Sequence, residues 1–517
     1  MSVKLRKEHI KLSQVICARS TKTTVESDVI VPDTKPDAVK ILKVCTEAVI
    51  TQKSVQSDKV YVEGIIRLDI LYVPEDKGCG RVKSISVDQN FNHIIAANGA
   101  KPGMNVEAAV VSVSPEYNLI NSRKIGIRST LCINIKVTEN KELEIASGVE
   151  DGADIQAKAK CLKFHNFCQC TERDVLIKDK IEVPQGKPDL KEILRFSIRP
   201  ELEELRLLTG KAVAKGNLKI CTLYSGKGED DVIECMEHSV PFGEVLEIDG
   251  IDESLNGEAV FSVKDVYYEI CRDNDGDKRL LSFETAICIE IKTTGITECE
   301  TMCDAYSLSR EVKMKKECCD IEQLVDIVTD KISLKEIARV SDYLPEVYQV
   351  CDCTASSEIE RVLVEGEIVT VTGYITTNIL YMSQSEEVPV SGFSHVLPFS
   401  HSARVDGICE NSVCDAKVEV EHLGYIISGN REIELRPTLN IGLKAVNPNS
   451  CEIVSEMEYD NEKEVPKRAA MVVYFVKKGD SLWDVAKRYR ITPEKIIEAN
   501  GSEKECMVEG NRIYIFK

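Results

Sequence analysis

The sequence predicts a multidomain, mainly β protein: three tandem β-rich repeat domains, each with one short helix, followed by a small β-α-α-β domain. Three observations support this fold class. The chain has 517 residues, more than a single hydrophobic core usually serves, so several domains are expected. A set of landmark residues recurs three times at domain-scale spacing. Residues 471–517 depart from that pattern and include apolar residues at helical spacing.

The repeat rests on three segments that share one template. They are "VEGIIRLDILY" (62–72), "AKGNLKICTLY" (214–224) and "VTGYITTNILY" (371–381). In each, a glycine lies eight residues before a tyrosine, and a phenylalanine and a second tyrosine follow at nearly constant spacing. The landmarks are Gly64, Tyr72, Phe91 and Tyr117; Gly216, Tyr224, Phe242 and Tyr268; and Gly373, Tyr381, Phe399 and Tyr425.

The short helix is expected where each repeat opens. The first two repeats open alike, with "VPDTKPDAVKIL" (31–42) and "VPQGKPDLKEIL" (183–194). Proline and aspartate before apolar residues at i, i+3 and i+4 predict a helix with a fixed start. The third repeat offers "IVTDKISLKEIA" (327–338), which lacks both prolines. Period-2 alternation broken by Gly, Asn and Asp predicts strands and hairpins elsewhere.

Each repeat is long enough to bury its own core, so we expect three beads along the chain and not a continuous stack. The segment "DNEKEVPKRAA" is charged and contains Pro466, which is typical of a linker. The expected limits are an N-terminal segment at 1–19, repeats at 20–155, 168–308 and 318–459, a linker at 460–470 and a last domain at 471–517.

Composition narrows the function classes. The net charge of −20 argues against nucleic-acid or anionic-lipid binding, because both need clustered Lys and Arg. No stretch approaches the ~20 apolar residues that cross a bilayer. The start, "MSVKLRKEHIKLSQVICARS", lacks the apolar region of a signal peptide. We therefore expect a cytoplasmic protein that is not secreted, with its 21 cysteines as reduced thiols.

Two stretches imitate metal sites. In "DNDGDKRLLSFE" (273–284), Asp273, Asp275, Asp277 and Glu284 have the spacing of a calcium loop. Lys278, however, stands where the EF-hand turn needs glycine, so a polar hairpin loop is the better interpretation. The second stretch does not have the C-x₂-C spacing of a zinc knuckle, and its thiols are better explained as buried or linker cysteines. Its residues are Cys161, His165, Cys168 and Cys170.

No catalytic residue is expected. His238 and His395 occupy similar places in "HSVPF" and "HVLPF", but neither has an Asp or Ser in a matching relay position. A packed histidine explains both. The sequence also lacks a nucleophile elbow, a P-loop, a dinucleotide fingerprint and an H-E-x-x-H motif. We therefore expect neither enzymatic activity, nor a cofactor, nor a metal.

The last domain is built around "YFVKKGDSLWDVAKRYRITPEKIIEANG" (474–501). "VVYFV" (472–476) predicts a strand, after which Asp480 or Ser481 caps a first helix. A second helix is expected to start at Thr492 and Pro493. "NRIYIF" (511–516) predicts the closing strand, which gives the order β-α-α-β.

This segment resembles a LysM domain. The residues that carry the match are Tyr474, Val476, Gly479, Asp480, Ser481, Leu482, Trp483, Ala486, Ile496, Asn500, Gly510 and Ile513. The match departs from the family at "YIF", which replaces a terminal proline, and in a compact loop. Most LysM domains bind N-acetylglucosamine polymers in a groove between two loops. The resemblance implies a partner- or glycan-binding groove made of Gly479, Asp480, Ser481, Leu482, Trp483, Asn500, Gly501 and Met507. For Trp483 a place in the core of this small domain is the competing interpretation.

The repeats resemble the SPOCS domains of clostridial proteins, on "VPDTKPDAVKIL" and the G-x₇-Y strands. Three such units followed by one LysM domain resemble the SipL-like family of sporulating clostridia. The resemblance implies a non-enzymatic spore-coat adaptor at the forespore surface in the mother cell. Its LysM domain would dock on the stage IV sporulation ATPase, with other coat proteins as further candidate partners. The alternative is a protein of the spore cortex or cell wall that binds peptidoglycan or N-acetylglucosamine.

The missing signal peptide favours the protein partner, because a wall-binding LysM domain normally follows one. Fold alone does not fix function, so a protein-binding LysM domain is physically reasonable. The sequence leaves open the oligomeric state, the role of each repeat and any dependence on the nucleotide state of the partner.

Overall fold

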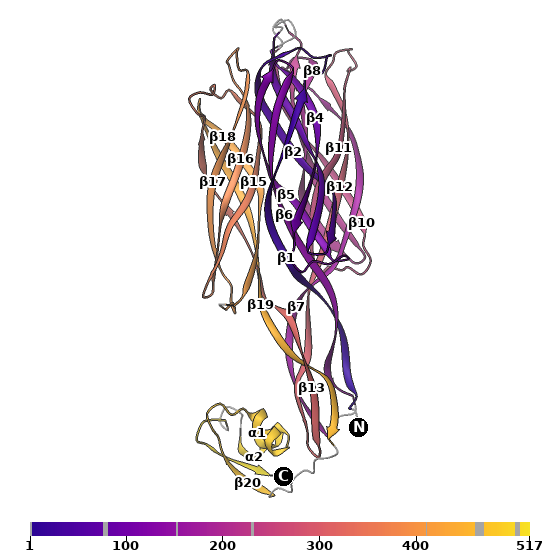
Figure 1. The fold of residues 1–517 in the computed structure, drawn as a ribbon, viewed down its shortest axis with the longest axis vertical. Coiled ribbons are helices and arrows are strands. Elements are labelled where there is room, and N and C mark those ends of the chain that lie inside the picture. Colours follow the sequence, from indigo (N-terminus) through magenta and orange to yellow (C-terminus); the bar gives the residue numbers. More distant parts are fainter. Residues whose placement is uncertain are drawn as a thin grey trace.

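Each repeat is a sandwich of two antiparallel sheets, which confirms the mainly β prediction (Figure 1). The computed structural model describes residues 3–75, 81–150, 154–228, 232–409, 411–460, 470–501 and 507–516, apart from the side chains of 12, 165–168, 318–323 and 448–452. In repeat 1 the sheets have the orders β1-β6-β5 and β2-β3-β4. The strands are β1 (Leu5–Ile30), β2 (Ala38–Gln56), β3 (Lys59–Pro74), β4 (Lys83–Ala96), β5 (Asn105–Asn121) and β6 (Lys124–Val149).

Repeats 2 and 3 use the same plan. Repeat 2 has the orders β11-β12-β7 and β10-β9-β8, and repeat 3 has β13-β19-β14, with β18 also on β19, and β15-β16-β17. Repeat 2 consists of β7 (Ile155–Glu182), β8 (Leu190–Leu208), β9 (Lys211–Gly226), β10 (Ile233–Glu247), β11 (Asn256–Cys271) and β12 (Leu280–Ser307). Repeat 3 consists of β13 (Glu311–Ser333), β14 (Glu336–Arg339), β15 (Gln349–Glu365), β16 (Ile368–Met382), β17 (Val390–Arg404), β18 (Val413–Gly429) and β19 (Glu432–Asp460).

The short helix predicted at the start of each repeat is wrong, because these residues begin strands β2 and β8. Two β-bulges explain the helix-like pattern. In β2 the register with β3 shifts between Ala38 and Lys40 and again between Ile41 and Lys43. β8 has the same two shifts against β9. A bulge adds a residue to one strand, so apolar side chains on one face are spaced by three instead of two.

The expectation that 327–338 is the opening segment of the third repeat is also wrong. In every repeat the hydroxyl of the buried landmark tyrosine donates to a proline carbonyl. The pairs are Tyr72 with Pro36 at 3.0 Å, Tyr224 with Pro188 at 3.2 Å and Tyr381 with Pro345 at 2.8 Å. The segment of repeat 3 that is equivalent to 31–42 and 183–194 is therefore 340–351, whereas 327–338 spans the end of β13 and the start of β14.

The landmark glycines and phenylalanines face each other across two strands. Gly64 pairs with Phe91, Gly216 with Phe242, and Gly373 with Phe399. On its other side each glycine lies beside a bulge in the first strand of the sheet, such as the shift between Leu202 and Glu204 in β8. A Cβ atom on any of these glycines would lie closer than 3.0 Å to a backbone oxygen and to the phenylalanine ring. Close approach of backbone and ring therefore requires glycine here.

The repeats are not separate beads, because a fourth apolar cluster joins them. Each sandwich has its own core. The joining cluster takes the same positions from every repeat: Leu71, Leu223 and Leu380; Leu42, Leu194 and Cys351; and Val82, Ile233 and Val390. The second sheets therefore meet around a pseudo-threefold axis. The expected limits of the repeats stay a prediction, although β1 runs through residue 19 and β7 already begins at Ile155.

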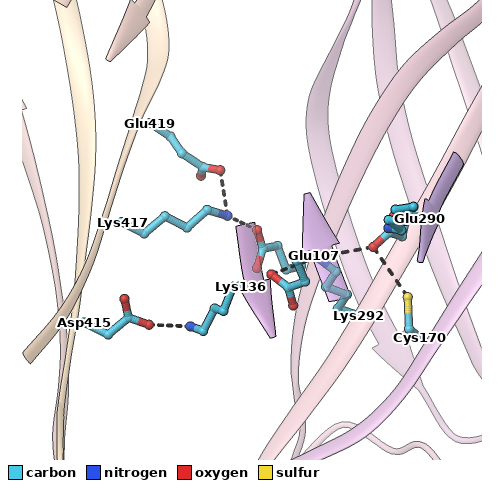
Figure 2. Close-up of polar contacts among 10 residues, drawn as sticks. Glu107, Lys136, Cys170, Glu290, Lys292, Asp415, Lys417 and Glu419 are labelled. Carbon is cyan, nitrogen blue, oxygen red and sulfur yellow. Dashed lines mark hydrogen bonds and ion pairs between the residues drawn. The ribbon is translucent and has the colours of Figure 1, made fainter. Parts of the chain in front are cut away.

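Three ion pairs join the repeats in a closed ring, each to the next (Figure 2). Lys136 of repeat 1 binds Asp415 of repeat 3, and Lys417 of repeat 3 binds Glu258 of repeat 2. Lys292 of repeat 2 closes the ring with Glu107 of repeat 1, at 3.4 Å. The three acidic residues are each the third residue of their strands, β5, β11 and β18. The acidic partners are thus equivalent in the three repeats, and Lys136 and Lys292 are equivalent residues of β6 and β12, whereas Lys417 comes from β18.

Six long strands continue beyond the sandwiches as a stalk of three two-stranded ribbons (Figure 1). The stalk comprises 5–14 with 139–149, 155–166 with 295–307, and 311–323 with 447–460. Its core takes side chains from all three ribbons, including Ile10, Phe164 and Ile453, and, nearer its end, Ala146, Met302 and Val454. The stalk is a shared element, not the property of one repeat.

The carboxyl-terminal domain has the predicted β-α-α-β order and lies beside the end of the stalk (Figure 1). Its elements are β20 (Met471–Phe475), α1 (Leu482–Tyr489), α2 (Pro493–Asn500) and β21 (Arg512–Phe516). Ser481 and Thr492 are the N-caps, as the sequence predicts. No helix among the described residues is both long and apolar enough to cross a membrane.

Candidate docking site on the carboxyl-terminal domain

The first wall of the expected groove is the turn between β20 and α1. A carboxylate oxygen of Asp480 accepts hydrogen bonds from the Tyr474 hydroxyl at 2.6 Å and from the Lys477 amide at 2.9 Å. These hydrogen bonds lower the pKa of Asp480. Gly479 has φ of +88°, a conformation that favours glycine. Asp480 therefore holds the turn in place, while Lys477, Lys478 and Gly479 are exposed.

The next two residues belong to the helix start. The Ser481 hydroxyl accepts from the Asp484 amide at 3.2 Å and donates to the Asp484 carboxylate at 2.6 Å. This is the ordinary role of an N-cap serine. Leu482 is buried in the domain core with Val485 and Ile496. Of the predicted groove residues, Leu482 thus serves the fold.

The second wall is formed by the end of α2 and the loop before β21. The Asn500 side chain donates to the Tyr514 carbonyl at 2.7 Å and accepts from the Tyr514 amide at 2.6 Å, which ties α2 to β21. Gly501 is exposed at the C-cap, and Met507 is half-buried against the core. The Gly510 amide donates to the Val476 carbonyl at 2.9 Å, so this loop lies next to the first wall.

Trp483 points away from this groove, toward the stalk. Its indole nitrogen donates to the Asp304 carboxylate of β12 at 2.8 Å. Its ring contacts Tyr306 edge-on, with 5.0 Å between centroids. The Tyr306 hydroxyl in turn donates to the Ile491 carbonyl at 2.6 Å, and Tyr306 belongs to the core cluster of the carboxyl-terminal domain.

Two ion pairs complete this contact. Both carboxylate oxygens of Asp304 lie 2.6 and 2.7 Å from the Lys487 amine. Burial alone would raise the pKa of Asp304, but the hydrogen bonds from Lys487 and Trp483 outweigh it and lower that pKa. Arg490 pairs with Glu311 at the start of β13. We call Asp304, Tyr306 and Glu311 the stalk-end site.

Sequence reasoning missed the stalk-end site because its residues lie far from the carboxyl-terminal domain in the chain. One signal was present. At the positions of Asp304 and Tyr306, repeat 1 has Gly148 and Glu150, and repeat 3 has Glu456 and Glu458. A buried tyrosine at one of three equivalent positions marks a contact that only repeat 2 makes.

The calcium-like stretch is an ordinary polar turn, and the weighed zinc site lies partly outside the described residues. Within the described part of the chain, no group of three or more His, Cys, Asp or Glu is placed to hold a metal. In the calcium-like stretch, Asp273 accepts hydrogen bonds from the amides of Asp275 and Asp277, as in an ordinary polar turn. The side chains of His165 and Cys168, two members of the weighed zinc site, lie outside the described residues.

Comparison with known families agrees with this organisation. The family described as SipL, SPOCS domain matches residues 37–120, 189–271 and 346–428, and the LysM domain family matches residues 474–504. The chain has the SipL-like architecture, with three SPOCS domains and one LysM domain. The SPOCS matches cover the second sheet of each sandwich and the strand after it (β5, β11 and β18). Both families are non-catalytic. No curated protein and no solved structure matched the chain.

Proposed function

We propose that this protein is a non-enzymatic adaptor of spore-coat assembly that docks through its LysM domain on the stage IV sporulation ATPase. It would act in the mother-cell cytoplasm, at the forespore surface, and help to encase the forespore. The SPOCS and LysM domains support the coarser statement that this is a sporulation-related, LysM-containing protein. The ATPase as partner and the location follow from the family resemblance.

The observation that supports this proposal best is how the LysM domain is presented. It lies at the end of the stalk, away from the three sandwiches (Figure 1), with the turn 477–479 and the loop 508–511 exposed. Residues 469–517 contain nine Lys and Arg against seven Asp and Glu, in a chain whose net charge is −20. An acidic protein surface would repel the acidic body of the molecule but not this near-neutral domain, so such a surface fits as the partner of the domain.

The test uses the exposed turn of the groove. Lys478→Glu reverses a charge beside Gly479, and we expect it to weaken binding of the purified ATPase. Lys495→Glu, a matched charge reversal on the exposed side of α2, is the control and should bind as the wild type does. Affinity is measured by titration at constant salt, because exposed charges are screened by salt.

Two results would contradict the proposal. In the first, a chain that lacks residues 466–517 still binds the ATPase with wild-type affinity. In the second, the full-length protein is retained by peptidoglycan or chitin and Lys478→Glu abolishes this retention, while the ATPase is not bound. That result would establish the glycan-binding alternative.

A further inference from the structure

The LysM domain is held on the stalk by a mixed polar and aromatic contact. Trp483 makes both kinds of interaction, with Asp304 and with Tyr306. Lys487 and Arg490, one and two turns further along the chain, each pair with a carboxylate of the stalk-end site. One face of α1 and the residue after it therefore lie against the stalk. The indole of Trp483 is half-buried there.

This contact leaves the two exposed loops of the groove free but covers Trp483. Trp483 is one of the residues expected to dock, so a partner that contacts its indole must first free it from the stalk-end site. We propose that the stalk-end site is an intramolecular binding site for the LysM domain, which withholds Trp483 from the protein partner until the domain is released. This inference rests on the proposed function, because it concerns the same docking residues.

The composition of the contact is suited to reversible release. Each of its ion pairs has one partly exposed partner: the side chains of Lys487 and Glu311 are 39% and 37% exposed, whereas those of Asp304 and Arg490 are 20% and 13% exposed. Salt reaches the exposed partner and weakens such a pair. Tyr306 makes the contact specific: its ring packs in the core cluster of the LysM domain, and its hydroxyl donates to the Ile491 carbonyl. Only repeat 2 has a tyrosine at this position.

Release leaves the domain tethered. Ten residues separate Asp460, the end of β19, from Met471, the start of β20. Fully extended, ten residues reach about 35 Å. Because the tether is short, the effective concentration of the LysM domain at the stalk-end site is high, on the order of millimolar. The released domain therefore rebinds its site readily. A partner that needs the open form therefore binds more weakly, in proportion to the open fraction.

The experiment uses Trp483 as its own reporter, because it is the only tryptophan in the chain. Asp304→Ala in the full-length protein removes the acceptor of the indole and of Lys487 without changing the LysM domain. We expect red-shifted emission and stronger quenching by acrylamide. Binding of the ATPase should tighten, roughly tenfold if about a tenth of the wild-type protein is open.

The matched control is Glu298→Ala on the same strand, β12, which removes the ion pair with Lys163 and leaves the stalk-end site unchanged. It should alter neither emission nor affinity. Tyr306→Phe is a second variant, which keeps the ring and removes only the hydroxyl. It should give an intermediate result, because the ring still packs on Trp483.

The proposal is overturned if Asp304→Ala leaves both quenching and affinity unchanged. It is also overturned if quenching rises while affinity for the ATPase stays the same or falls, since the contact would then not withhold the docking face. The tryptophan signal needs no partner. If the ATPase binds neither the wild type nor Asp304→Ala, the proposed function is wrong, and so is the proposal that the stalk-end site competes with the ATPase. The acrylamide quenching still decides whether Trp483 contacts the stalk.

Discussion

At the residue scale, close contacts determine which residue type a few positions can hold. The spacing in the sequence shows that these residues recur, but not why. The landmark glycines are the clearest case. Gly216 lies beneath the Phe242 ring and beside the Glu201 carbonyl, next to a bulge in β8. The same arrangement recurs at Gly64 and Gly373. The glycine recurs with the phenylalanine because a side chain at its position would collide with the phenylalanine ring and with the neighbouring backbone oxygen.

We predict that Gly216→Val destabilises the protein by about 1–3 kcal/mol, because the new side chain must displace backbone or a packed ring. Thermal denaturation of the full-length protein measures the change. Gly243→Val is the control: a Cβ atom there meets nothing nearer than 3.6 Å, the Lys215 side chain. Equal midpoints for Gly216→Val and the wild type would show that the ring moves aside easily.

The second prediction at this scale concerns pH. The pKa of Asp304 lies below its usual 3.8 when the LysM domain is on the stalk, since Lys487 and Trp483 donate to the ionised form. The stability that Asp304 contributes is therefore complete above about pH 4 and is lost as the pH falls through the lowered pKa. Its charged neighbours are Lys487 of α1 and its register partner Lys158 of β7. Trp483 emission should stay constant from pH 8 to pH 5; a transition near pH 6.5 would contradict this.

At the scale of the elements, β-bulges and strand length shape the molecule. Paired bulges in β2 and β8 give a helix-like spacing to what is a strand. The long strands β6, β12 and β19 continue past the ends of β5, β11 and β18, so that only their long partners β1, β7 and β13 remain beside them. A lone two-stranded ribbon is marginally stable. The three ribbons are stable because they bury their apolar faces against one another.

We predict that Phe164→Ala loosens all three ribbons, although the change lies in one. Phe164 is fully buried in the stalk core, and such truncations cost about 3–5 kcal/mol. Hydrogen exchange should speed up at 5–14 and 447–460 as well as at 155–166, while β3 stays protected. Leu176→Ala on the same strand is the control, because Leu176 is 55% exposed. Faster exchange limited to β7 and β12 would show that the ribbons are independent.

At the scale of the whole molecule, the three SPOCS domains form one cyclic unit. Lys43, Arg195 and Asp352 occupy one equivalent position, opposite the leucines of the joining cluster. There Asp352 binds Arg195 and Arg199, each at 2.6 Å, and Arg195 also faces Asp69 of repeat 1 at 3.7 Å. Burial alone would raise the pKa of Asp352, but the two arginines outweigh it and lower that pKa. This position thus carries a positive charge in repeats 1 and 2 and a negative charge in repeat 3, and Arg195 links all three repeats.

We predict that Asp352→Ala costs about 3–5 kcal/mol, because it leaves Arg195 buried without its main partner. The denaturant midpoint of the full-length protein reports the loss. Asp415→Ala, which removes a half-exposed partner from the ion-pair ring, should cost less than about 1 kcal/mol. An equal loss of unfolding free energy in the two variants would mean that Asp352 contributes no more to stability than a half-exposed ion-pair partner does.

The sequence alone determined the parts of this protein that depend on local pattern. The threefold repeat and the β-α-α-β order of the LysM domain follow from turn residues, caps and periodic apolar residues that neighbouring positions specify. The incorrect prediction of a short helix also has a local origin, because bulges in β2 and β8 space the apolar residues as a helix would. The groove residues stay a prediction: the structure brings the two segments that hold them side by side, but Leu482 and Asn500 serve the fold and Trp483 faces the stalk.

Only the tertiary structure decided how the parts come together. The cyclic packing depends in part on Arg195 and Asp352, which occupy one equivalent position but differ between the repeats. A search for repeated residues therefore does not find them. The stalk depends on ribbons whose partners lie more than a hundred residues apart. The contact between Trp483 and Asp304 joins two such distant segments. Long-range contacts of this kind leave no periodic signal, because burial and charge pairing act between surfaces that exist only after each domain has folded.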